Sequence, residues 1–195
     1  MNLVILAGGK SSRFGKDKAL VKFEGVPIIE RILSALGMLF RKHIIVTNHP
    51  NNYAKLGCLV AADIYKNIGP LGGLHAGLTY SNEALNFIVA CDMPLIKPEL
   101  AAYLIAITGY NAVVPVVKGF PEPLLAVYSR QCLAAMEEMI GVGQYKISSL
   151  YEKIDIKFVP EEELKKADPE LKSFCNINHL MELKRHERTS KNNQV

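Results

Sequence analysis

The sequence predicts an α/β protein, a three-layer sandwich with a central, mostly parallel, twisted sheet. Short continuous apolar segments, which are typical of strands buried on both faces, alternate along the chain with segments of helical apolar spacing. Glycine-rich or polar turns follow the first four of these apolar segments, and in open α/β sheets ligands bind beyond the carboxyl ends of the strands. At 195 residues, the chain has the size of one domain with a substantial core.

The expected elements alternate in the order that this fold class requires. Strands are expected at 3–6, 43–47, 58–62, 86–91, 112–117, 123–128 and 154–159. Helices are expected at 28–40, 51–56, 98–107, 130–140, 147–151 and 161–167, with one more opening in the glycine-rich segment 69–77 and one closing the chain. We assign residues 1–186 to a single domain and residues 187–195 to a polar, frayed C-terminal tail.

Composition and charge narrow the class of ligand. The formal net charge of +4 suits an anionic small molecule, and the cations form no long basic block of the kind that binds nucleic acid. The apolar stretches are broken well before the roughly 20 residues that a membrane span needs, and the N-terminus has no signal-like pattern. Four widely spaced cysteines indicate neither a zinc site nor a disulfide framework. We therefore expect a cytoplasmic protein that binds neither nucleic acid nor membranes.

The loop after the first expected strand, residues 6–18, has the composition of a phosphate-binding loop. Glycine allows tight turns and close approach of backbone N–H groups, and lysine and arginine donate charge-assisted hydrogen bonds to phosphate. The loop is not a Walker A motif, because five residues separate Gly9 from Gly15 and Asp17 follows Lys16. A Gly-x-Gly-x-x-Gly fingerprint is also absent. The alternative is a glycine-rich surface turn with solvated lysines.

Polar side chains follow the next three expected strands. Asn48 comes after the second strand, Asp63 after the third and Asp92 after the fourth, so all three are expected at one rim of the sheet with the glycine-rich loop. Each has a structural alternative. Asn48 also suits the turn before Pro50, Asp63 could cap a strand end, and Asp92 could be a helix N-cap or a turn residue.

The pattern Leu-Ala-Gly-Gly-x-x-x-Arg-Phe-Gly-x-x-Lys over residues 6–18 resembles the signature loop of nucleotidyltransferases, which transfer an NMP from an NTP and release pyrophosphate. Within them the chain most resembles the molybdenum cofactor guanylyltransferases, which join GMP to molybdopterin. Further matching stretches lie at 69–73, 91–94, 122–128 and 174–178. Phe14 replaces the methionine that is usual in this family, and His179-Leu180 replaces the frequent Thr-Pro.

The resemblance implies a fold, a site and substrates. It implies a Rossmann-like nucleotide-binding half, GTP and molybdopterin as substrates, and Mg²⁺ as the cofactor. The expected protein partners are transient ones, either other enzymes of molybdenum cofactor biosynthesis or the enzymes that accept the finished molybdenum cofactor. Carried over by position, the residues that line or contact the nucleotide are Leu6, Ala7, Gly8, Lys18, Asn48, Asp63 and Asp92. Asp92 would also bind Mg²⁺, while Lys18 and Arg13 would stabilise the departing pyrophosphate.

Two other functions stay open from the sequence. A related enzyme, either a cytidylyltransferase for the same cofactor or a sugar-phosphate nucleotidyltransferase, would share the loop and the strand ends. A non-catalytic nucleotide-binding protein could retain the same fold. The presence of both Lys18 and Asp92 favours an enzyme, since both charges serve the reaction.

Overall fold

The computed structural model describes residues 1–8 and 18–178, so the expected closing helix, the tail and most of the glycine-rich loop lie outside the described part. Within that part, eight strands form a sheet of order β10-β7-β9-β6-β1-β4-β5, with β8 paired to β7. The strands are β1 (Asn2–Leu6), β4 (His43–Val46), β5 (Leu59–Ala61), β6 (Leu85–Ala90), β7 (Ala112–Val117), β8 (Phe120–Pro121), β9 (Leu125–Ser129) and β10 (Ile156–Val159).

The main sheet is mostly parallel, as the sequence predicts. β1 pairs in parallel with β4 and with β6, β4 pairs in parallel with β5, and β7 pairs in parallel with β10. β9 runs antiparallel to both of its neighbours, β6 and β7. Leu6 is in register with Val46 on one side and with Ala90 on the other, so three strands end level with one another.

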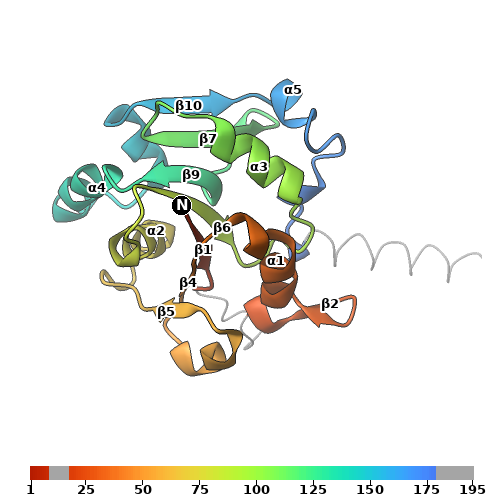
Figure 1. Cartoon of the computed structure of the whole chain (residues 1–195). Coiled ribbons are helices and arrows are strands. Elements are labelled where there is room, and N and C mark those ends of the chain that lie inside the picture. Colours follow the sequence, from red (N-terminus) through yellow and green to blue (C-terminus); the bar gives the residue numbers. More distant parts are fainter. Residues whose placement is uncertain (9–17, 179–195) are drawn as a thin grey trace, which may run out of the picture.

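Helices cover both faces of the sheet (Figure 1). They are α1 (Ile28–Leu36), α2 (Pro70–Tyr80), α3 (Pro98–Ala106), α4 (Cys132–Gly141) and α5 (Glu161–Leu164). Leu3 and Ile5 of β1 pack in one hydrophobic cluster with α1, α3 and α5, whereas Val4 and Leu6 pack in a second cluster with α2 and α4. This alternation along β1 gives the predicted three-layer sandwich.

Several expected helices are shorter or tighter than predicted. The segment 51–56 forms two 3₁₀ turns, Pro50–Asn52 and Ala54–Leu56, and residues 147–151 lie in the 3₁₀ helix Ile147–Glu152. α1 ends at Leu36 and passes into a 3₁₀ turn, and α5 ends at Leu164 instead of extending to residue 167. Short segments make too few hydrogen bonds to offset the cost of helix nucleation, and the 3₁₀ form is common in such pieces.

A hairpin connects the glycine-rich loop to α1. The 3₁₀ turn Lys18–Leu20 leads into β2 (Lys22–Phe23) and β3 (Val26–Pro27). The turn between these strands lies at Glu24 and Gly25, which have positive φ values of 52° and 85° respectively.

Helix α2 lies unusually close to β1 at Gly77. A Cβ atom on this glycine would lie 2.4 Å from Cγ1 of Val4 and 3.5 Å from Cγ2 of Val46. Any side chain at this position would therefore push α2 away from β1 and β4.

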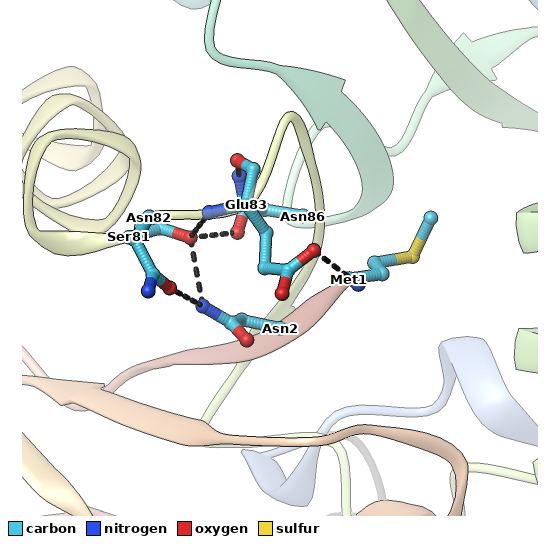
Figure 2. Close-up of polar contacts among 6 residues, drawn as sticks. All are labelled: Met1, Asn2, Ser81, Asn82, Glu83 and Asn86. Atoms are coloured by element: carbon cyan, nitrogen blue, oxygen red, sulfur yellow. Dashed lines mark hydrogen bonds and ion pairs between the residues drawn. The ribbon is translucent and has the colours of Figure 1, made fainter.

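A polar network joins the N-terminus of β1 to the loop between α2 and β6 (Figure 2). Asn2 donates through Nδ2 to Oγ of Ser81 at 2.9 Å, and the Ser81 hydroxyl donates in turn to Oδ1 of Asn86. All three residues are buried. The N-terminal ammonium of Met1 lies 2.9 Å from Oε2 of Glu83. The network connects the two segments at the amino end of the sheet, opposite the carboxyl ends of the parallel strands.

A buried ion pair anchors the segment before residue 174 to the entrance of α3. Asp168 is fully buried, and its Oδ1 lies 2.9 Å from Nζ of Lys97. Its Oδ2 accepts a hydrogen bond from the backbone N–H of Ser173 at 2.8 Å, and Oγ of Ser173 accepts one from the backbone N–H of Lys97 at 3.0 Å. Burial opposes ionisation of Asp168, but Lys97 and Ser173 outweigh it and hold its pKa below the ordinary value.

The substitution Gly77→Ala tests the close packing of α2. We expect it to lower the free energy of unfolding by about 1–3 kcal/mol, because the new methyl group overlaps Val4. Gly141→Ala in α4 is the matched control, since nothing lies within 4 Å of the added Cβ there. Urea denaturation measures the free energy of unfolding of both variants. An equal decrease in the two variants would contradict the packing argument.

The substitution Asp168→Asn tests the ion pair through pH. Because the folded-state pKa of Asp168 is lowered, its stabilisation is complete above the unfolded-state pKa of about 3.9 and is lost as the pH falls through the folded-state pKa. We therefore expect the variant to have a lower urea midpoint than the wild type at pH 7 and the two midpoints to converge below about pH 4. A difference that stays constant with pH would show that the charge of Asp168 does not stabilise the fold.

Candidate functional site

The rim at the carboxyl ends of β1, β4, β5 and β6 is fixed by hydrogen bonds that continue the sheet. The N–H of Ala7 donates to the carbonyl of Val46 at 2.8 Å, and the N–H of Cys91 donates to the carbonyl of Leu6 at 3.1 Å. Leu6 and Ala7 are buried and Gly8 is exposed. Because the Leu6 and Ala7 side chains lie in the core, any contact of these two residues with a ligand would be through their backbone.

Asn48 and Asp63 meet on one side of this rim. Nδ2 of Asn48 donates to Oδ2 of Asp63 at 2.9 Å, which joins the residues that follow β4 and β5. A depression of about 230 Å³ begins at Asn48 and is lined by residues 48–52. The first turn of α2 is close by, because a Cβ on Gly73 would lie 3.8 Å from Oδ1 of Asp63. No described side chain caps the N-terminus of α2, and such an end favours anions.

Lys18 lies within electrostatic reach of Asp92, the residue that follows β6. Asp92 is partly buried, and burial raises the pKa of its carboxyl group while the charge of Lys18 lowers it in part. The Asp92 carbonyl accepts a hydrogen bond from the N–H of Ile177 at 2.8 Å. The structure thus brings two of the predicted site residues together and adds the segment 174–178 to them.

Arg31 of α1 holds the turn after Asp92. Its Nε donates to the carbonyl of Pro94 at 3.3 Å, and its guanidinium lies over the ring of Phe23, 5.1 Å from the centroid. Sequence reasoning missed this residue. An arginine in an amphipathic helix ordinarily points to solvent, so the sequence contains no signal that could have found it.

A cavity of about 300 Å³ opens beside Asp92. It is lined by Ala90, Asp92, Met93, Glu122, Pro123, Leu124, Phe174 and Asn176, so three of the stretches singled out in the sequence meet there. Glu122 is partly buried, and burial, together with the negative charge of Asp92, raises the pKa of its carboxyl group. Sequence reasoning placed Glu122 in a matching stretch and left open whether it helps to bind the pterin, without counting it among the site residues.

The described residues could supply a metal ion with Asp92 as a hard oxygen ligand. Across residues 1–8 and 18–178, no group of three or more histidine, cysteine or acidic side chains is arranged to hold a metal. A cation here would therefore need phosphate and water oxygens to complete its shell, which suits Mg²⁺. Arg13, the third predicted catalytic residue, lies outside the described residues.

Two further expectations concern the whole chain. None of the four cysteines forms a disulfide in the structure, and Cys132 is buried while the other three are partly exposed. None of the helices in the described ranges is both long enough and apolar enough to cross a membrane.

The chain is similar to known proteins over nearly its whole length. Residues 3–157 match the family described as the MobA-like NTP transferase domain. The molybdenum cofactor guanylyltransferase of Desulfosudis oleivorans is 36% identical over 195 residues, covering 98% of this chain and 96% of the relative. A probable molybdenum cofactor guanylyltransferase of Pelotomaculum thermopropionicum is 39% identical over 177 residues, covering 90% of this chain and 86% of the relative.

A solved structure agrees with this likeness. The molybdopterin-guanine dinucleotide biosynthesis protein A from Archaeoglobus fulgidus superposes with a TM-score of 0.80 at 32% identity, covering 98% of this chain and all of that chain. Sequence and fold thus agree with the predicted resemblance, and the chain belongs to the molybdenum cofactor guanylyltransferase family of MobA-like NTP transferases.

Proposed function

We propose that this protein transfers GMP from GTP to the terminal phosphate of molybdopterin, with or without bound molybdenum, and releases pyrophosphate. The observation that supports this best is the meeting of Lys18 and Asp92 at the rim, beside a cavity formed by three separate sequence stretches. The membership of the chain in a guanylyltransferase family indicates GTP and molybdopterin as the substrates.

In this proposal the nucleotide lies along the rim from β1 toward β5. The backbone of Leu6, Ala7 and Gly8 lines it. Asn48 and Asp63, which are hydrogen-bonded to each other, contribute to the GTP site on the outer side. The N-terminus of α2 adds N–H groups that favour the negative charge of the phosphates.

The reaction requires that the two substrates are positioned and that the negative charge of the phosphates is stabilised. It requires no protein nucleophile. An oxygen of the acceptor phosphate forms the new bond to the α-phosphorus, and the bond from this phosphorus to the bridging oxygen of pyrophosphate breaks. Lys18 and Arg13 would stabilise the charge that develops on the leaving pyrophosphate.

The proposal includes Mg²⁺ as the cofactor, held by Asp92. Bound there, the ion would neutralise part of the triphosphate charge. The partly buried Asp92 carboxylate is a suitable hard ligand for it. We further propose that the protein works in the cytoplasm and meets transient partners of molybdenum cofactor synthesis.

Nucleotide selectivity is the first test, because a related cytidylyltransferase would use the same rim. We expect pyrophosphate release in the presence of Mg²⁺ and molybdopterin with GTP, and little with ATP, CTP or UTP. The assay measures pyrophosphate with each of the four nucleotides. Selectivity for CTP would contradict the proposed donor, and tight GTP binding without turnover on any acceptor would favour a non-catalytic role.

The substitutions Asp92→Asn and Lys18→Ala test the two charged residues at the end of β6. We expect each to lower kcat by about 100-fold or more, because each removes a charge that acts on the triphosphate in the transition state. Lys55→Ala is the matched control, since Lys55 is exposed in the 3₁₀ turn Ala54–Leu56. Circular dichroism checks folding, and full activity of Asp92→Asn would remove Asp92 from the mechanism.

Removal of the metal ion tests whether the reaction requires Mg²⁺. Chelation with EDTA is expected to abolish pyrophosphate release, and excess Mg²⁺ to restore it. The Mg²⁺ concentration for half-maximal activity should rise in Asp92→Asn, because the variant loses the charged ligand. Undiminished turnover in EDTA would contradict the metal requirement.

A further inference from the structure

The cavity beside Asp92 lies on the opposite side of the rim from the Asn48–Asp63 pair. In the sheet order β9-β6-β1-β4-β5, Asn48 and Asp63 follow β4 and β5, whereas Glu122 lies in the connection between β8 and β9. Asp92, at the end of β6, lies between them. A triphosphate at Asp92 would therefore separate a nucleoside on the β4–β5 side from an acceptor on the β9 side.

Glu122 is held firmly in this cavity. Its N–H donates to the carbonyl of Pro115 at 2.8 Å, and its carbonyl accepts a hydrogen bond from the N–H of Leu125 at 3.2 Å. Two residues further on, the carbonyl of Leu124 accepts a hydrogen bond from the N–H of Ala90 at 2.8 Å, which ties the connection to β6. The backbone of this connection is thus hydrogen-bonded to β7, to the start of β9 and to the end of β6.

The ligand that the cavity suits depends on the surroundings of the Glu122 carboxylate. Among the described residues the structure gives it no side-chain hydrogen bond and no ion pair, and the charged neighbour that acts most on it is the like charge of Asp92. The carboxylate is only partly buried, so water can hydrate it, and a ligand that enters the cavity and displaces this water must supply N–H donors in its place. The cavity therefore suits a ligand that offers N–H donors to Glu122.

The other walls of the cavity suit a flat ring. Met93, Pro123, Leu124 and Phe174 are apolar, and Phe174 is aromatic. The volume of about 300 Å³ lies at the lower end of the range of small-molecule sites. Apolar walls that include the aromatic ring of Phe174, next to the Glu122 carboxylate, describe a site for a heteroaromatic ring with N–H groups on one edge.

We propose that Glu122 recognises the acceptor of this reaction, by accepting two hydrogen bonds from the 2-amino-pyrimidinone edge of its pterin ring. This edge carries a ring N–H beside an exocyclic amine, and a carboxylate can accept both at once. Guanine carries the same edge, but the position of Glu122 across Asp92 from the Asn48–Asp63 pair assigns it to the acceptor. The inference rests on the proposed function.

The test uses binding without turnover. The intrinsic fluorescence of 6-hydroxymethylpterin is titrated with the wild-type protein and with Glu122→Gln, in the presence and absence of GTP. We expect the variant to bind this pterin at least about 10-fold more weakly, since charge-assisted hydrogen bonds are lost. Glu30→Gln is the matched control, because Glu30 is an exposed carboxylate on α1.

A lumazine has a carbonyl group in place of the exocyclic amine of the pterin. It therefore tests whether the protein recognises the 2-amino-pyrimidinone edge. The wild type should prefer the pterin over the corresponding 6-hydroxymethyllumazine, and Glu122→Gln should lose most of this preference. The affinity for GTP, measured by equilibrium dialysis, should be the same in both proteins. Unchanged pterin binding in Glu122→Gln would overturn the proposal.

Other results would also overturn it, each in favour of a specific alternative. Weaker GTP binding in Glu122→Gln with unchanged pterin binding would assign the residue to guanine. A higher Mg²⁺ requirement with unchanged pterin binding would make Glu122 a metal ligand. Whether the wild type transfers GMP to molybdopterin is measured separately, so pterin recognition by Glu122 and the proposed reaction can fail independently.

Discussion

The parallel pairing of β1 with β4 and β6 is the constraint on which the rest of the site depends. Leu6, Val46 and Ala90 are in register, and hydrogen bonds from Ala7 and Cys91 continue the ladders beyond the strand ends. This fixes the backbone before Gly8, Asn48 and Asp92 at the same level. Close packing of α2 at Gly77 and the buried polar network at the amino end stabilise the same strands.

Much of this arrangement could be predicted from the sequence, because it follows from local patterns. Continuous apolar runs identify buried strands, and the rule for carboxyl ends places Asn48, Asp63 and Asp92 on one rim. The boundaries of short helices could not be predicted, since residues 50–56 and 147–152 depend on tertiary packing more than on apolar spacing. The contacts of Arg31 with Pro94 and of Lys97 with Asp168 join distant segments and have no local signal.

The buried ion pair of Asp168 and Lys97 connects stability with the candidate site. Ser173, which accepts a hydrogen bond from Lys97 and donates one to Asp168, directly precedes Phe174 of the cavity wall. Ile177, which directly follows Asn176 of the cavity wall, donates to the carbonyl of Asp92. The segment 174–177 is therefore fixed at both ends, and its position at the cavity does not rely on its own short 3₁₀ turn.

The antiparallel direction of β9 determines which residues this strand brings to the ligand-binding rim of the mixed sheet. Residues that follow a parallel strand arrive at the rim, but a strand of opposite direction brings to that rim the residues that precede it. β9 runs against β6 and β7, so Glu122 reaches the cavity from the N-terminal side of its strand. A search for ligand-binding residues in mixed sheets should therefore look before each reversed strand as well as after each parallel one.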